Sequence, residues 1–163
     1  MRQYTVPDIP HSVWQKPSHF IAFGFGAGAL PFAPGTFGTL IAIPFYLTLQ
    51  SLSVTTYLLI LSSLVIGSIA LCQKVSQEIH IEDHQGMCLD EIIGYLVTLI
   101  NAPRGFIWMA LGFLFFRLFD IWKPWPIRWV DHTIHGGLGM ILDDVLAGIV
   151  SFILLQLLAG FVL

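Results

Sequence analysis

The segment GGLGMILDDVLAG, residues 136–148, opens an apolar stretch in which Asp143 and Asp144 are the only charges between Leu138 and Leu163. A stretch of this length and composition predicts a membrane helix. A charged Asp at the centre of such a helix costs about 2.5–3.5 kcal/mol on insertion scales. The cost is lower one or two turns from the start, but it still requires compensation. The helix dipole would explain one Asp in the first turn, and explains two at this depth poorly.

The composition extends this interpretation to the whole chain. Of its 163 residues, 56% are hydrophobic and 10% are charged, and the mean hydropathy is +0.80. Soluble domains carry about 25% charged residues, so the sequence predicts an integral membrane protein. A net charge of −3 without a basic tract argues against a nucleic-acid partner. Two cysteines are too few for a disulfide framework or a cysteine-rich metal site.

Four further apolar runs precede the last helix: Leu40–Leu49, Val54–Cys72, Ile92–Ala102 and Phe106–Phe116. They are too long and too rich in Leu and Ala for strands. We therefore expect an all-α fold, a compact bundle of apolar membrane helices made of two hairpins and a C-terminal helix. The third and fourth runs have about 11 residues, or about 16 Å, against a hydrocarbon core of about 30 Å. They are longer helices with polar ends in protein, a re-entrant pair, or part of a bundle resting on or partly in the bilayer.

The domain organisation follows from the polar segments. Residues 1–18 are rich in Pro and polar side chains, which predicts an N-terminal surface arm. Residues 19–163 are predicted to form one membrane-embedded helical domain. Within it, FGFGAGALPFAPGTFGT (23–39) contains too much Gly and Pro for a regular helix and is expected to be a loop.

The two hairpins predict the topology, because each returns the chain to the side it left. Segments 23–39, 74–91 and 117–137 and the start of the last helix then share one face. Six of the seven basic residues lie on that face, and only Arg104 lies opposite. The positive-inside rule predicts a multi-pass protein whose polar face lies in the cytoplasm. The basic residues of this face are Arg2, Lys16, Lys74, Arg117, Lys123 and Arg128.

More acidic residues belong to the same predicted face. Asp90 and Glu91 are adjacent in LDEIIGY, and Asp120 lies in FRLFDIW. Metal coordination would explain such carboxylates beside apolar helices. Carboxylates without cysteine ligands favour a hard cation, and in a cell Mg²⁺ is the first candidate.

Three basic residues, Arg117, Lys123 and Arg128, flank Asp120. Together with a metal ion they would suit a phosphate group, because the Arg fork grips two oxygens and Lys adds a point charge. Each of them taken singly is equally well explained as an interfacial anchor. Trp122, Trp125 and Trp129 in the same segment are typical of a membrane interface.

The segment APGTFGT (33–39) is a second candidate for phosphate binding. Thr36 or Thr39 could cap the first membrane helix, and Gly35 and Gly38 leave backbone N–H groups accessible. A plain N-cap and turn is the other interpretation, and the residue types favour it. Four histidines are predicted to be surface or interfacial residues rather than ligands: His80, His84, His132 and His135.

Several phosphatase mechanisms are excluded because the chain lacks their sequence motifs. The chain has no Cys-x5-Arg nucleophile loop, no D-x-D-x-[TV] motif, no G-x-S-x-G elbow and no Walker A loop. Metal-assisted attack by water on a phosphoryl group remains.

Three motifs together, FAPGTFGT, LDEIIGY and FRLFDIWKPWPIR followed by GGLGMILDDVLAG, resemble the phosphatidylglycerophosphatase A family. The resemblance extends from about Phe20 into the last helix, although DHQGMCLDE is more polar in its middle than is usual in that family. It implies a bacterial inner-membrane enzyme that requires Mg²⁺ and converts phosphatidylglycerophosphate, made at the cytoplasmic leaflet, to phosphatidylglycerol and phosphate. The motif acids of that family correspond to Asp90, Glu91, Asp120, Asp143 and Asp144.

The residue roles expected on this basis fall into three sets. The catalytic set is Asp90, Glu91, Asp120 and Asp144. The metal ligands are Glu91, Asp120, Asp143 and Asp144, with Asp90 as the alternative to Asp120. The phosphate-binding set is Gly35, Thr36, Thr39, Arg117, Lys123 and Arg128.

Two other functions fit the composition. Acids in apolar helices also mark the pathways of small ion or proton transporters, but a transporter needs polar groups through the membrane depth. A non-catalytic membrane scaffold would leave the carboxylates unexplained. The partners expected for an enzyme are the phospholipid substrate and the membrane, and no obligate protein partner is evident.

Overall fold

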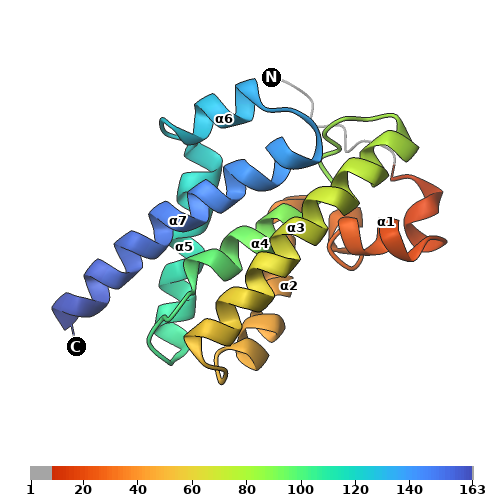
Figure 1. Ribbon diagram of the computed structural model, residues 1–163. Coiled ribbons are helices and arrows are strands. Elements are labelled where there is room, and N and C mark those ends of the chain that lie inside the picture. Colours follow the sequence, from red (N-terminus) through yellow and green to blue (C-terminus); the bar gives the residue numbers. More distant parts are fainter. Residues whose placement is uncertain (1–8, 163) are drawn as a thin grey trace.

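The structure of the chain, a computed structural model, describes residues 9–162. Within that range every regular element is a helix, which confirms the predicted all-α class (Figure 1). The elements are η1 (His11–Trp14), α1 (Pro17–Ala22), η2 (Ala27–Ala29), α2 (Pro34–Leu49), α3 (Val54–Ile79), α4 (Leu89–Thr98), α5 (Phe106–Trp122), α6 (Ile127–Thr133) and α7 (Gly136–Val162). Helices α4 and α5 pack together as the second predicted hairpin, whereas α2 and α3 follow one another through a short turn and pack mainly against α4 and α7, respectively, rather than against each other.

Helices α3 and α7 are long and apolar enough to cross a membrane. They have 26 and 27 residues, which at 1.5 Å per residue is about 40 Å for each. Most residues of their apolar windows are not buried by the rest of the protein. These two helices are compatible with a membrane protein, because a lipid environment would cover the apolar side chains that the fold leaves exposed.

Helix α4 is the inner helix of the bundle. It packs against α2, α3, α5 and α7 (Figure 1). All its residues from Ile92 to Thr98 are buried. Its 10 residues reach only about 15 Å, so it is too short to span a bilayer. Helix α5, by contrast, has 17 residues and continues past Phe116 to Trp122. The fourth run is therefore a longer helix with a polar end in protein, one of the alternatives that the sequence left open.

Close contact between α4 and α7 depends on two glycines. A Cβ atom at Gly94 would lie 2.7 Å from the backbone oxygen of Asp144, and one at Gly148 would lie 2.9 Å from Cβ of Val97. Real Cβ atoms do not approach other atoms so closely. The absence of side chains at Gly94 and Gly148 thus allows the start of α4 to lie beside the acidic part of α7.

The start of α2 differs from the prediction. Residues 34–39 were expected in a loop but are helical, because Pro34 occupies the first helical position, where its fixed φ suits a helix. The N-cap residue is Ala33, with φ 47°, and it makes no side-chain capping bond. The caps predicted at Thr36 and Thr39 are therefore wrong. The Thr39 hydroxyl instead donates to the Gly35 carbonyl at 2.8 Å, inside the helix.

Part of the predicted N-terminal arm lies outside the described residues. Of the part that is described, Val13 is fully buried in the hydrophobic core. Nearby, His19 lies 3.0 Å from both the Ser12 hydroxyl and the Glu78 carboxylate, and Lys16 donates to the same carboxylate at 2.5 Å. These contacts fasten the segment before α2 to the end of α3.

Candidate active site

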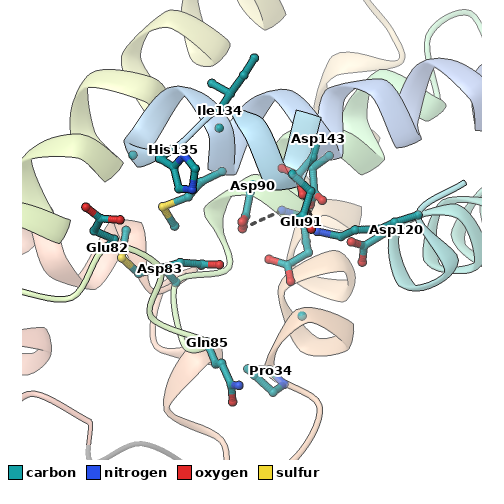
Figure 2. A pocket seen from close by; sticks show the side chains of 18 of the residues that line it. Pro34, Glu82, Asp83, Gln85, Asp90, Glu91, Asp120, Ile134, His135 and Asp143 are labelled. Atoms are coloured by element: carbon teal, nitrogen blue, oxygen red, sulfur yellow. Dashed lines mark hydrogen bonds and ion pairs between the residues drawn. The ribbon is translucent and has the colours of Figure 1, made fainter. Parts of the chain in front are cut away.

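The largest concentration of charge in the fold surrounds one cavity of about 450 Å³. Eight of the ten acidic residues of the chain line it: Glu82, Asp83, Asp90, Glu91, Asp120, Asp131, Asp143 and Asp144. Figure 2 shows Glu91, Asp120 and Asp143 on one side, and Glu82, Asp83 and His135 on the other. The loop after α3, the start of α4, the end of α5, α6 and α7 all contribute.

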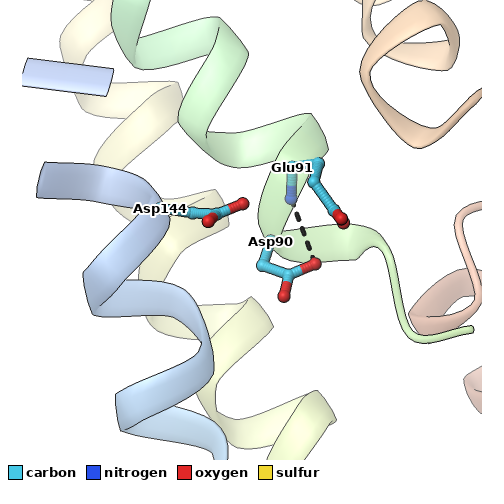
Figure 3. Close-up of side chains that lie close together, drawn as sticks. All are labelled: Asp90, Glu91 and Asp144. Atoms are coloured by element: carbon cyan, nitrogen blue, oxygen red, sulfur yellow. Dashed lines mark hydrogen bonds between the residues drawn. The ribbon is translucent and has the colours of Figure 1, made fainter. Parts of the chain in front are cut away.

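Three of these acids form a compact cluster. Asp90, Glu91 and Asp144 each offer a carboxylate oxygen, and the three oxygens lie within 4.8 Å of one another. Asp90 and Glu91 belong to the first turn of α4, where the helix dipole favours negative charge. Figure 3 shows Asp144 projecting from α7 toward them, and Asp90 Oδ1 accepting from the Glu91 backbone N–H at 3.1 Å.

The cluster carries more negative charge than its surroundings compensate. Burial raises the pKa of Asp90 well above its usual value, and the charges of Glu91 and Asp144 raise it further. Among residues 9–162, no group donates to the buried oxygens Glu91 Oε2, Asp143 Oδ1 and Asp144 Oδ2. Buried polar atoms normally have a partner. Oxygens so placed fit a hard divalent cation such as Mg²⁺, which prefers carboxylate ligands.

Arg117 connects the cluster to α5. Its Nη1 lies 3.9 Å from Glu91 Oε1 and also pairs with Asp120, one turn further along the helix. The Arg117 Nε atom is buried and has no partner within the described part of the chain. The guanidinium therefore keeps one unpaired donor next to the cavity.

Lys123 ends α5 in a left-handed conformation, with φ 45°. Its ammonium donates to Asp131 Oδ1 and to Asp143 Oδ2, each at 2.6 Å. Burial acts to lower the pKa of Lys123, but the hydrogen bonds that it donates to the two carboxylates outweigh burial and raise it. Lys123 is thus a fixed positive charge on the cavity wall, with a third N–H left for another acceptor.

Eight of the predicted site residues line this cavity: Gly35, Asp90, Glu91, Arg117, Asp120, Lys123, Asp143 and Asp144. The grouping differs from the predicted metal set. Asp90 joins Glu91 and Asp144 in the cluster, whereas Asp143 and Asp120 pair with basic side chains.

Three of the predicted phosphate-binding residues do not line the cavity. Thr39 is buried within α2 with its hydroxyl bonded to Gly35, and Thr36 lies outside the lining. Arg128 is exposed on α6 and lines a neighbouring groove. Gly35 is in close contact with the site, because a Cβ atom there would collide with Glu91 and lie 3.0 Å from Arg117 Nη1.

The sequence reasoning missed some residues of the site. Asp131 and Asp83 line the cavity although neither belongs to a recognised motif. The only signal for them is their place in the two polar segments that the topology puts on the same face. The prediction that His84 lies at the surface is wrong, because the residue is fully buried. Its ring centroid lies 5.1 Å from that of Phe23, and its Nδ1 accepts from the Gly86 N–H at 3.0 Å.

The arrangement has a clear chemical character. A carboxylate cluster that needs a cation lies next to an Arg and a Lys with unused donors. Such a site could hold a divalent ion at the carboxylates and a phosphate group at the two basic side chains.

Comparison with known proteins is consistent with this chemistry. A family model described as "Phosphatidylglycerophosphatase A" matches residues 20–159. The chain is 41% identical over 137 residues to "Phosphatidylglycerophosphatase A" of Escherichia coli (strain K12), across 83% of this chain and 80% of that protein. It is 36% identical over 140 residues to the protein of the same name from Haemophilus influenzae, across 85% and 86%.

A third relative has a different name. The chain is 36% identical over 143 residues to "Putative phosphatidylinositol-3-phosphatase" of Bacteroides thetaiotaomicron, across 83% of this chain and 89% of that protein. No solved structure matches the chain.

Proposed function

The chain belongs to the phosphatidylglycerophosphatase A family and is a phosphoric monoester hydrolase, and from this premise we propose that it removes the terminal phosphate of phosphatidylglycerophosphate. The products are phosphatidylglycerol and phosphate. The observation that carries the assignment is the cluster of Asp90, Glu91 and Asp144, whose oxygens lie within 4.8 Å of one another beside Arg117.

In this proposal the cluster binds Mg²⁺. Asp90, Glu91 and Asp144 are the ligands, because they converge and because Glu91 Oε2 and Asp144 Oδ2 have no other partner among residues 9–162. When bound, the ion polarises the phosphoryl group and offsets its charge. Asp120 and Asp143 do not bind the ion in this proposal. Asp120 holds Arg117 in place, and Asp143 holds Lys123.

Arg117 and Lys123 bind the phosphate monoester. The buried Nε of Arg117 and the third N–H of Lys123 are the donors that the fold leaves unused. Both side chains are anchored by carboxylates, so they lose little freedom when the substrate binds. Their positive charges also stabilise the negative charge that spreads over the equatorial oxygens in the transition state.

The reaction is a hydrolysis in which water attacks phosphorus from the side opposite the leaving group. Water attacks phosphorus, the bond from phosphorus to the glycerol oxygen breaks, and the glycerol oxygen takes a proton as it leaves. A carboxylate of the cavity accepts the proton of the attacking water. Eight acids line the cavity, and Asp90, Glu91, Asp120 and Asp144 are the candidates for that carboxylate.

The proposed location is the bacterial inner membrane, with the cavity facing the cytoplasm. Helices α3 and α7 have the length and composition to cross the bilayer. The bias of Lys and Arg toward the cavity end then predicts the cytoplasmic orientation. The inner helix α4 lies within the protein, and its first turn meets the substrate at the depth of the lipid headgroups.

No observation favours the transporter alternative. Beyond Asp144, α7 contains no charged side chain, and α3 contains none before Lys74. The acids gather in one cavity instead of forming a series along the helices.

Phosphate release by the purified protein tests this function. The protein is assayed in non-ionic detergent micelles with phosphatidylglycerophosphate, with Mg²⁺ or with an excess of chelator. We expect release that requires the ion and that is lost in Asp144→Asn. A wild-type protein that releases no phosphate would refute the activity, and release unchanged by the chelator would refute the metal.

Glu78→Gln is the matched control. Glu78 is the only acid in the described part of the chain that does not line the cavity, and Gln can still bond to its neighbours Lys16 and His19. This variant should retain normal activity. Phosphatidylinositol 3-phosphate, assayed alongside, shows how strictly the protein selects the headgroup.

A further inference from the structure

A groove lies beside the acidic cavity, on α6 and the loop before it. Its volume is about 580 Å³ and its walls include Trp122, Trp125, Arg128, Trp129 and His132. The chemistry of the two hollows is opposite. Eight acids line the cavity, whereas none lines the groove, whose only charged side chains are cationic. The groove therefore favours an anion, whereas the cavity first needs a cation.

The two hollows share one residue, Lys123, which lines both. The left-handed turn at Lys123 ends α5, and the groove follows directly in the chain. Lys123 is also one of the two proposed ligands of the phosphate monoester. A ligand whose monoester reaches Lys123 can thus extend directly into the groove.

Arg128 has no partner within residues 9–162. Its side chain is exposed on α6 and makes no ion pair or hydrogen bond there. Arg117 and Lys123, in contrast, are both held by carboxylates. A guanidinium without a carboxylate can grip two oxygens of a phosphate with its planar fork.

The tryptophans indicate where the groove lies relative to the membrane. Trp122, Trp125 and Trp129 expose 68%, 83% and 57% of their surface. Tryptophan with so much exposed apolar surface is typical of the membrane–water interface, where the phosphodiesters of phospholipids lie. The groove therefore lies at the level of the bilayer where lipid phosphodiesters are found, and it contains a cation that can bind one.

We propose that this groove binds the phosphodiester of the lipid substrate, with Arg128 as its ligand, while the terminal monoester lies in the cavity. This inference rests on the proposed function and adds a determinant of specificity to it. Phosphatidylglycerophosphate carries a diester one glycerol unit from its monoester, whereas phosphatidic acid carries the monoester alone. Arg128 thus selects lipids that carry both groups.

Kinetics with the two lipids test the assignment. Arg128→Gln is compared with Lys74→Gln, which removes the same charge from an exposed position outside the groove. In non-ionic micelles, Arg128→Gln should lower kcat/KM for phosphatidylglycerophosphate about tenfold through KM, the loss expected for one charge-assisted contact. It should leave kcat/KM for phosphatidic acid unchanged, and Arg128→Lys should recover part of the loss. Lys74→Gln should change neither value.

Two outcomes would overturn the proposal. One is an unchanged KM for phosphatidylglycerophosphate in Arg128→Gln. The other is an equal loss with both lipids, which would make Arg128 a general anchor at the interface. A wild-type protein that hydrolyses neither lipid is a separate result, since it refutes the proposed activity and not the groove.

Inhibition by phosphatidylglycerol decides the case in which phosphatidic acid is not a substrate. Phosphatidylglycerol keeps the diester and lacks the monoester, so its binding reports on the groove alone. Arg128→Gln should require about tenfold more phosphatidylglycerol for half-inhibition than Lys74→Gln. Equal values in the two variants would show that Arg128 does not bind the diester.

Discussion

Lys123 Nζ lies 2.6 Å from Asp143 Oδ2, and this contact joins the loop after α5 to the second turn of α7. The same ammonium holds Asp131 of α6 at 2.6 Å. One basic side chain thus fixes three elements around the cavity. The contact also explains one of the two adjacent aspartates of α7. Asp143 compensates the charge of Lys123, whereas Asp144 belongs to the carboxylate cluster.

Replacing Lys123 with Gln should impair both activity and stability. The change removes a proposed ligand of the phosphate and leaves the buried Asp143 without its partner. We expect kcat/KM to fall about 10²-fold, and the free energy of unfolding to fall by about 1–3 kcal/mol, because the pair is only partly buried. Phosphate release and thermal unfolding in detergent measure the two effects. Arg104→Gln, at the opposite end of the molecule, should change neither, and an equal effect of both variants would refute the role of Lys123.

Metal binding should be visible without catalysis. Addition of Mg²⁺ to the wild-type protein should raise its unfolding temperature, since a ligand present at 100 times its Kd stabilises the fold by about 2.7 kcal/mol. Glu91→Gln and Asp144→Asn should remove most of this rise. Without the ion, both variants should unfold at or above the wild-type temperature, because each removes one of several crowded negative charges.

The metal measurement is independent of any substrate. Calorimetric titration of the same proteins with Mg²⁺ alone gives the affinity directly. Wild-type affinity in both variants would show that the cluster is not the metal site, even if their phosphatase activity were lost.

Gly94 should tolerate no side chain. In Gly94→Ala the new Cβ would lie 2.7 Å from the Asp144 backbone oxygen, so α4 and α7 must separate. We expect a loss of about 1–3 kcal/mol in the free energy of unfolding, the usual cost of overpacking. Activity should fall as well, because Asp144 moves away from Glu91. Gly67→Ala is the control: nothing lies within 4 Å of its new Cβ, and better helix propensity should stabilise it by up to about 1 kcal/mol. Equal changes in the unfolding temperature of the two variants would contradict the close helix contact.

The orientation in the membrane is testable with single cysteines. Both natural cysteines, Cys72 and Cys88, are buried and give a low background. Gln85→Cys places an exposed thiol beside the cavity, and Ser51→Cys places one in the turn between α2 and α3. In spheroplasts a membrane-impermeant maleimide should label the second and not the first, and in inverted vesicles the reverse. The opposite pattern would put the cavity outside the cytoplasm.

The class of fold was predictable because it depends on long apolar runs. The boundaries were less so where polar residues lie inside a helix. Helix α5 continues through Arg117 and Asp120, since both face a cavity within the protein, and a hydropathy pattern ends the helix at Phe116. Pro34 shows the converse: a segment rich in Gly and Pro predicts a loop, whereas Pro34 starts α2.

The sequence predicted which acids lie at the cavity, but not which side chain each of them contacts. Adjacent acids beside apolar runs identified Asp90, Glu91, Asp143 and Asp144 as residues that need compensation. Which oxygen meets which partner depends on the rotation of α4 and α7 about their axes, and adjacent residues of a helix point about 100° apart. The sequence therefore could not assign Asp144 to the cluster and Asp143 to Lys123.

Because eight acids gather around one cavity, the rest of the described surface has almost no carboxylates. Over residues 9–162 the remaining acid is Glu78, which is neutralised by Lys16 and by Lys74 3.9 Å away. Outside the cavity, the described part of the protein therefore presents no unpaired carboxylate to an anionic bilayer, including one enriched in the reaction product. The proposed product would therefore not repel the protein from the bilayer as it accumulates there.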